Sequence, residues 1–309
     1  MIPSPSIPLP EGEGRKGTKY MNEKINKVVI ISMGLIGGSI GMSIKNRQLA
    51  KTVIGISRSM DSINKAVKKS AIDSGATNKA NGVANADLIF ICSPINMIIP
   101  ALKEILPFVK QGCVITDVGS TKSMIVEEAQ KIVPAGVHFI GGHPMAGSER
   151  AGIDAASAFL LDGANYVLTP TQKTDNQKLE YLKSFLISLD VNIIILNPEI
   201  HDAIVAAISH LPIVIAAALV NTISDCHDLK EEMITLASSG FRDSTRVASG
   251  NVDMGRDIFI SNKDQLIKMI ENYKKALNKL EDYISKGDLP GMESELSHAK
   301  KLRDSMYSA

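Results

Sequence analysis

Two different patterns of apolar and polar positions divide this chain near Asn197 and Pro198. Before that point, short apolar runs alternate with amphipathic stretches, such as the one carrying Ile98, Leu102 and Ile105. The apolar runs lie at residues 27–31, 52–56, 87–92, 113–118, 138–142, 165–170 and 191–196. Near-continuous apolar strands that alternate with helices are typical of a mostly parallel sheet covered on both faces. We therefore predict an α/β fold for this half.

The second half shows no convincing strand and consists of long helical patterns that end in a lysine-rich stretch at 255–286 and a last helix near 292–306. Its most apolar run, residues 203–220, contains Ser209, His210 and Pro212. These residues favour a buried helix, kinked or broken at Pro212, over a membrane span. We predict one domain at 21–196 and a helical substrate and dimerisation domain at 197–309. The apolar helix would supply part of the dimer core, or of the core of one subunit.

Composition excludes several classes of function. Hydrophobic residues make up 44% and charged residues 22% of the 309 residues, and the formal net charge is +1. Such a balance gives no long-range attraction to nucleic acid or to an acidic membrane. Cys92, Cys113 and Cys226 are far apart and form no CxxC pair, which favours a reducing, cytoplasmic location and argues against a structural zinc site. Residues 1–20 lack the apolar segment of a signal peptide, and we interpret them as a disordered or mis-annotated extension before Met21.

The first apolar run is followed by a glycine turn and a helical pattern, in the sequence SMGLIGGS at 32–39. Strand, glycine turn and helix in this order indicate a dinucleotide-binding site of the Rossmann type. Gly34 would let the backbone approach a pyrophosphate, and Gly37 would let the helix pack closely on the strand. Leu35 and Ile36 lie at the helix N-terminus, whose free N–H groups attract phosphate. Ser32 stands where the first glycine belongs, so we expect a slightly altered turn that still binds the cofactor; the alternative is a turn that only packs a helix.

The end of the second strand bears on the choice between NAD and NADP. An NAD site usually places a carboxylate about twenty residues beyond the glycine turn, whereas this chain has Ser57, Arg58 and Ser59 there. A hydroxyl and a guanidinium suit a 2′-phosphate, so we favour NADP over NAD. Arg58 could instead be a solvated surface residue or stack on adenine in an NAD site. Ser93 and Pro94, after the third apolar run, complete the candidate cofactor-binding residues.

Three polar clusters are candidates for chemistry. DVGSTK at 117–122 follows a strand, where open α/β sheets place ligands, although Ser120 or Thr121 could simply cap the next helix. GGHPMAGSE at 141–149 puts His143 on a glycine-rich loop, where an imidazole with an ordinary pKa of ~6.5 can accept a proton. GFRDSTR at 240–246 could be a surface ion-pair cluster or could present an arginine to an anionic substrate.

Together with HDAIVAAISHLP at 201–212, these clusters resemble the prephenate/arogenate dehydrogenase family in order and spacing over about residues 27–260. The resemblance implies an enzyme of tyrosine biosynthesis. Such an enzyme oxidises the ring C4 alcohol of prephenate or arogenate by hydride transfer to NAD(P), while the ring carboxylate leaves as CO2. It also implies a Rossmann-type domain followed by an all-α dimerisation domain, an active site in the cleft between them, and a homodimer.

By the same resemblance, His143 is the catalytic histidine that hydrogen-bonds the C4 hydroxyl, and Ser120 orients that hydroxyl and the nicotinamide. Arg246 corresponds to the arginine that binds a substrate carboxylate. The other implied substrate-binding residues are His210, Gly147, Ser148 and Glu149. No metal is implied.

Two positions differ from many prephenate-type members. Ile213 stands where those proteins have a histidine after Leu-Pro, and residues 254–256 replace a segment that carries a tryptophan. In both respects the chain is similar to cyanobacterial-type arogenate dehydrogenases, which use NADP, whereas Glu149 is a feature of prephenate-type members. The substrate therefore stays open between prephenate and arogenate.

Two other functions are compatible with a two-domain plan of this kind. A 3-hydroxyacid or imine reductase shares the plan but commonly uses a lysine from the helical domain, and no comparable motif is evident in the sequence. A non-catalytic NADP-sensing protein would bind the cofactor without needing both His143 and Arg246.

Overall fold

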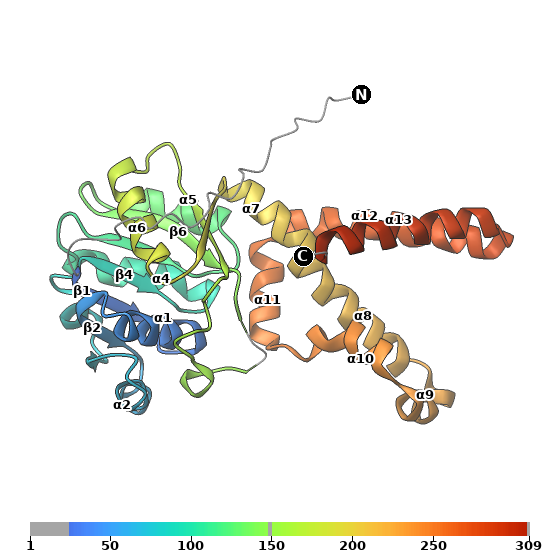
Figure 1. The fold of residues 1–309 in the computed structure, drawn as a ribbon, viewed down its shortest axis with the longest axis horizontal. Helices are drawn as coiled ribbons and strands as arrows, with labels where there is room; N and C mark the ends of the chain where they lie inside the picture. The colour runs from blue at the N-terminus through green and yellow to red at the C-terminus, as the bar shows by residue number, and fades with distance from the viewer. Residues whose placement is uncertain (1–24, 148–149, 308–309) are drawn as a thin grey trace.

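The computed structural model describes residues 25–147 and 150–307, and its first half is built on one eight-stranded sheet (Figure 1). The spatial order is β3-β2-β1-β4-β5-β6-β7-β8, and neighbouring strands are parallel except for the antiparallel pair β6–β7. The strands are β1 Ile25–Ile31, β2 Ala50–Ile56, β3 Ser74–Ala76, β4 Leu88–Ile91, β5 Val114–Asp117, β6 His138–Pro144, β7 Asn165–Thr169 and β8 Asn192–Ile195. The predicted α/β fold is confirmed. The expected extension at residues 1–20 lies outside the described residues.

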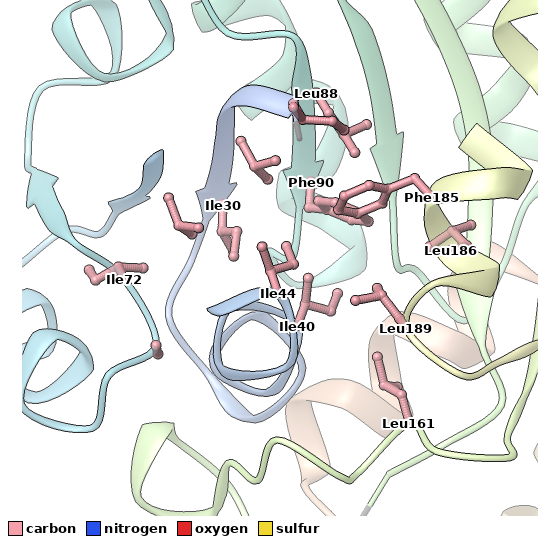
Figure 2. Packing of buried hydrophobic residues seen from close by; sticks show 14 of the residues in the cluster. Ile30, Ile40, Ile44, Ile72, Leu88, Phe90, Leu161, Phe185, Leu186 and Leu189 are labelled. Carbon is pink, nitrogen blue, oxygen red and sulfur yellow. The ribbon is translucent and has the colours of Figure 1, made fainter. Parts of the chain in front are cut away.

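Helices cover both faces of the sheet and create two separate cores. On one face, α1 (Leu35–Asn46), α2 (Met60–Lys68) and α6 (Asn176–Ile187) bury their apolar side chains; on the other, α3 (Lys79–Val83), α4 (Ile95–Ile105) and α5 (Ser123–Ile132) do so. In Figure 2, the α1 and α6 side chains meet at Phe90, whose ring centroid lies 6.0 Å from that of Phe185. Both cores take residues from the same strands, and this explains the near-continuous apolar runs.

The second half is helical throughout its described residues. It consists of α7 (Pro198–Val205), a π-helical segment (Ala206–His210), α8 (Leu211–Ser224), α9 (Lys230–Leu236), α10 (Ser239–Thr245), a 3₁₀ segment (Arg246–Ser249), α11 (Val252–Ser261), α12 (Lys263–Lys286) and α13 (Leu289–Tyr307). α11 packs against α4 of the sheet domain, and α12 and α13 form a hairpin that projects away from it (Figure 1).

The apolar run at 203–220 forms neither a broken helix nor a helix buried within the chain. α7, the π segment and α8 continue without interruption from Pro198 to Ser224, because Pro212 lies in the first turn of α8, where its missing N–H is tolerated. Only 22% of the most apolar window of this helix is buried. By length and composition alone the helix could cross a membrane. However, His201, Asp202 and His210 on it are buried in contacts with the rest of the protein, which is not the arrangement of a lipid-facing span.

Candidate active site

The glycine turn after β1 fits a dinucleotide. Gly34 is the N-cap of α1 with no side chain bonded to the helix end, and a Cβ added at Gly34 would meet no atom within 4 Å. The first N–H groups of α1 therefore face open space, as phosphate binding requires. A Cβ at Gly37 would lie 2.2 Å from the carbonyl oxygen of Ser32, so only glycine lets α1 approach β1 this closely. Leu35 and Ile36 form the first turn of α1, as the sequence predicts.

Ser32 adopts the backbone conformation that normally favours glycine at this point. Its φ is +73°, in the left-handed region, which costs a non-glycine residue roughly 1–2 kcal/mol. The Ser32 hydroxyl lies 2.9 Å from the Ser93 hydroxyl, in the loop between β4 and α4 that Pro94 completes. A serine can therefore replace glycine here, because its side chain gains a partner in the neighbouring loop.

At the end of β2, Ser57 is half-buried, whereas Arg58 and Ser59 are exposed. Ser59 is the N-cap of α2 and accepts the Ser62 N–H at 3.2 Å. Arg58 pairs with no carboxylate among the described residues. The strand end thus carries a permanent positive charge beside two hydroxyls.

A buried ion pair organises the loop after β5. Asp117 pairs with Lys122, and both side chains are fully buried. The Asp117 carboxylate also accepts the N–H of Gly119 at 2.8 Å and of Gly142 at 3.1 Å, so it joins the ends of β5 and β6. Burial lowers the pKa of Lys122, while Asp117 opposes that shift. Ser120, between these paired residues, is only half-buried and lies at the edge of the sheet where both strands end.

The alternative that Ser120 or Thr121 caps α5 is wrong. The hydroxyl of Thr121 donates to Ser261 of α11 at 3.0 Å. The N-terminus of α5 is instead capped by Asp202 of α7, whose carboxylate accepts the N–H of Lys122 at 2.7 Å and of Ser123 at 2.8 Å. A helix of the second half thus supplies the cap for a helix of the first half.

His143 lies within β6, not on a loop as predicted, and only 9% of it is exposed. Its backbone is paired with Val167 of β7, so the strand ladder sets the position from which the ring projects. His143 Nδ1 lies 2.9 Å from His201 Nε2, and His201 Nδ1 lies 2.8 Å from the Asp202 carboxylate. The two rings meet edge to face at 77°, with centroids 5.1 Å apart. His143, His201 and Asp202 therefore form one continuous hydrogen-bonded chain, which we call the relay.

Electrostatics keeps His143 neutral. Burial lowers its pKa well below the ordinary 6.5, and the neighbouring His201, Lys122 and His210 lower it further. Burial alone would raise the pKa of Asp202, but hydrogen bonds from His201 and Ser123 outweigh burial and lower it. The relay therefore joins a neutral imidazole to an ionised carboxylate near neutral pH.

His210 ends the π-helical segment and is fully buried. The side-chain amide of Asn262 donates to the Asp202 carbonyl at 2.7 Å and lies 3.1 Å from His210 Nδ1, so Nδ1 is the acceptor in that contact. His210 Nε2 then carries the proton and has no partner among the described residues. Burial lowers the pKa of His210 to about 4, against an opposing effect of Asp202. This histidine is a neutral hydrogen-bond donor close to the relay.

The remaining predicted substrate residues are spread over two segments. Gly147 is exposed at the end of the loop after β6, and Ser148 and Glu149 lie outside the described residues. Arg246 is exposed at the start of the 3₁₀ segment, which packs against α8. Arg242 pairs with its neighbour Asp243 at 3.1 Å, with both side chains more than two-thirds exposed.

His201, Asp202 and Asn262 also belong to the site, although none of them was among the site residues predicted from the sequence. His201 and Asp202 stand together at the start of an apolar helix, where two adjacent polar residues are unexpected, and that was the available signal. No signal points to Asn262, because its role depends on the packing of α12 against the π segment. No group of residues able to hold a metal ion is found in the described ranges.

The chain is similar to known proteins in sequence and in fold. Residues 40–195 match the family model described as prephenate dehydrogenase, nucleotide-binding domain, and residues 197–298 match prephenate dehydrogenase, dimerization domain. A prephenate dehydrogenase of Bacillus subtilis is 36% identical in sequence to this chain. The aligned region covers 93% of this chain and 77% of the Bacillus protein.

Two solved structures are also similar over almost their whole length. Synechocystis arogenate dehydrogenase has a TM-score of 0.80 and 36% identity, covering 91% of this chain and 99% of its own. Prephenate dehydrogenase from Aquifex aeolicus, in complex with hydroxyphenyl propionate and NAD+, has a TM-score of 0.86 and 30% identity, covering 93% and 100%.

Proposed function

The chain belongs to the prephenate dehydrogenase family, and we propose that it oxidatively decarboxylates prephenate in tyrosine biosynthesis. The observation that carries the proposal is His143, a buried neutral histidine near the C-terminal end of β6, an interior strand of the nucleotide-binding sheet, held by the relay. The Gly34–Gly37 turn would hold the cofactor's pyrophosphate at the N-terminus of α1.

In the proposed reaction three residues of the protein act on the substrate: His143, Ser120 and Arg246. His143 accepts the hydrogen of the ring C4 hydroxyl, while the bound nicotinamide dinucleotide supplies the hydride acceptor for the C4 hydrogen. The bond from the ring to the carboxylate breaks, CO2 leaves, and its electron pair completes the aromatic ring. The proton returns to the oxygen of the phenol, so the step consumes no net proton. Ser120 orients the hydroxyl, and Arg246 binds a carboxylate of the substrate.

The activity is tested by incubating the full chain with prephenate or arogenate and with NAD+ or NADP+, and by following the absorbance of the reduced nicotinamide. Turnover of prephenate supports the proposal, and a parallel rate with arogenate would extend it to that substrate. Absence of turnover in all four combinations would contradict it.

The cofactor preference follows from the end of β2, and we propose NADP. Arg58, which pairs with no carboxylate among the described residues, supplies a positive charge and Ser57 a hydroxyl, and none of residues 57–59 is a carboxylate that would repel a 2′-phosphate. Charge-assisted hydrogen bonds of this kind contribute roughly 1–3 kcal/mol. We expect kcat/KM to favour NADP by a corresponding factor, and Ser57→Asp to reverse the preference by repelling the phosphate and engaging the ribose hydroxyl.

A matched control is Ser70→Asp, which adds the same charge to an exposed serine beyond the other end of α2. It should leave the ratio of the two kcat/KM values unchanged. A parent protein that prefers NAD would show that Arg58 makes no contact with a phosphate.

We also propose a homodimer formed through the helical domain. Ile200, Ile204 and Ile208 recur every four residues along α7 and the π segment and are 53%, 41% and 57% exposed. At the far end of α8 an apolar groove is lined by Ile223, Leu229, Glu232, Met233, Leu236, Ala237, Ser238 and Phe241. Exposed apolar surface of this extent is typical of an interface between subunits.

We expect the protein to sediment as a dimer at micromolar concentration, and Ile208→Asp to shift it toward monomer because a buried charge would be unpaired in the interface. Phe108→Asp is the control, since Phe108 is similarly exposed, at 49%, but lies in the nucleotide-binding half. A monomeric parent protein would contradict this assembly.

A further inference from the structure

The relay crosses from one half of the protein to the other. His143 belongs to β6 of the nucleotide-binding half, whereas His201 and Asp202 belong to α7 of the helical half. The Asp202 carboxylate in turn accepts hydrogen bonds from the N–H groups of Lys122 and Ser123, which belong to the nucleotide-binding half. All three relay side chains are buried, with 9%, 1% and 2% exposed, so water does not compete for these hydrogen bonds.

Resting on the proposed function, we propose that His201 and Asp202 are positioning residues that hold His143 in the tautomer whose Nε2 is free to accept the substrate hydroxyl hydrogen. A neutral imidazole has one N–H and one bare nitrogen, so the partner of one nitrogen determines what the other can do. His143 alone could carry its proton on either nitrogen.

The direction of the relay is set at Asp202. Its carboxylate sits at the N-terminus of α5, where two backbone N–H groups and the helix dipole favour the ionised form. A carboxylate can only accept, so His201 Nδ1 carries a proton and His201 Nε2 is bare. The bare His201 Nε2 accepts from His143 Nδ1 at 2.9 Å. His143 Nε2 is therefore left without a proton, as a base requires.

The reverse direction would disable the base. With a proton on His201 Nε2, His143 Nδ1 would become the acceptor, and His143 Nε2–H would point a donor at the substrate hydroxyl. Burial of the ring also opposes protonation of His143 altogether, and so do the neighbouring His201, Lys122 and His210. The relay thus has one productive arrangement, and it exists only when α7 is packed on the ends of β6 and α5.

Two substitutions of His201 separate positioning from packing. His201→Leu fills the space but gives His143 Nδ1 no acceptor, whereas His201→Gln can offer its amide oxygen to the same proton. We expect His201→Leu to lower kcat by at least about tenfold, with the KM values of substrate and cofactor changed less than about threefold. His201→Gln should recover a substantial part of kcat. Equal losses in both variants, or nearly full activity in His201→Leu, would overturn the proposal.

Asp202→Asn tests the other end of the relay, because the amide cannot replace both carboxylate oxygens as acceptors. It should also lower kcat more than KM rises. Asp175→Asn is the matched control, since Asp175 caps α6 through the Lys178 N–H at 3.0 Å without contacting a histidine. A comparable loss of kcat in Asp175→Asn would assign the effect to helix capping and overturn the role of Asp202.

A readout that needs no turnover keeps this proposal separate from the proposed function. Nitrogen-15 NMR of the imidazole rings in the full-length resting protein reports which nitrogen of His143 is protonated, with the signal assigned by its absence in His143→Asn. We expect the parent protein and His201→Gln to show the proton on Nδ1, and His201→Leu to show it increasingly on Nε2. A parent protein with the proton on Nε2 would overturn the relay even if prephenate is oxidised, whereas a proton on Nδ1 would support it even if prephenate is not.

Discussion

His143→Ala is expected to lower kcat by about 10²- to 10⁴-fold, the range over which a positioned acid–base group accelerates a reaction. In the proposed mechanism the His143 imidazole in β6 is the base that meets the C4 hydroxyl, and it is buried and linked through His201 to the buried Asp202 carboxylate. The measurement is single-turnover or steady-state kcat with prephenate. A variant with nearly parental kcat would show that His143 is a structural histidine.

Because His143 lies in a strand, the alanine variant also tests stability. Removing the ring leaves His201 Nε2 without its partner, and such a loss costs roughly 1–3 kcal/mol. His143→Asn, whose amide can still donate toward His201, should retain more of the free energy of unfolding while losing a similar part of kcat. Thermal unfolding of both variants, measured beside kcat, separates the two effects.

If His143 is the base, its lowered pKa determines how kcat/KM depends on pH. The pKa of His143 is lowered well below 6.5 by burial and by its cationic and imidazole neighbours, so the neutral, accepting form persists as the pH falls through 6.5. We expect kcat/KM of the parent protein to stay on its plateau there and to fall only at lower pH. A decline centred near 6.5 would indicate a base that titrates as a solvated histidine does.

The alternation of apolar runs and amphipathic stretches was sufficient to predict the sheet and its helices, because strands buried on both faces must be apolar almost throughout. It missed β3, since Ser74–Ala76 pairs only at the sheet edge and contains no large apolar residue. It also predicted a buried helix at 203–220 but left open whether a second subunit or the same subunit buries it. Periodicity reports that a surface is apolar, and it does not report whether the same chain or a second copy covers it.

Motifs and resemblance located His143 and the glycine turn, but the sequence could not give the relay. His143 and His201 are 58 residues apart and meet only because α7 packs against α5 beside the end of β6. The cap of α5 could not be predicted from the sequence either, because it also comes from a residue distant in the chain. Local propensity favoured Ser120 or Thr121, and a carboxylate from a distant helix took their place because its charge satisfies two N–H groups at once.

Arg246→Ala is expected to weaken binding of the substrate by about 2–5 kcal/mol if the bound substrate buries the ion pair between its carboxylate and the guanidinium. Arg246 begins the 3₁₀ segment after α10, and its side chain is exposed. The loss should appear mainly in KM, because the guanidinium is proposed to bind a carboxylate already present in the unreacted substrate. Initial rates over a range of prephenate concentrations measure it.

Arg242 is the control, four residues earlier in the same motif. Its guanidinium already faces Asp243 at 3.1 Å, and the two side chains are 77% and 70% exposed. An exposed ion pair of this kind contributes at most about 1 kcal/mol, so Arg242→Ala should change KM little. Arg246→Lys should fall between the two, since an ammonium keeps the charge but not the two parallel hydrogen bonds of a guanidinium. An equal or larger effect at Arg242 would mean that the resemblance assigns the wrong arginine.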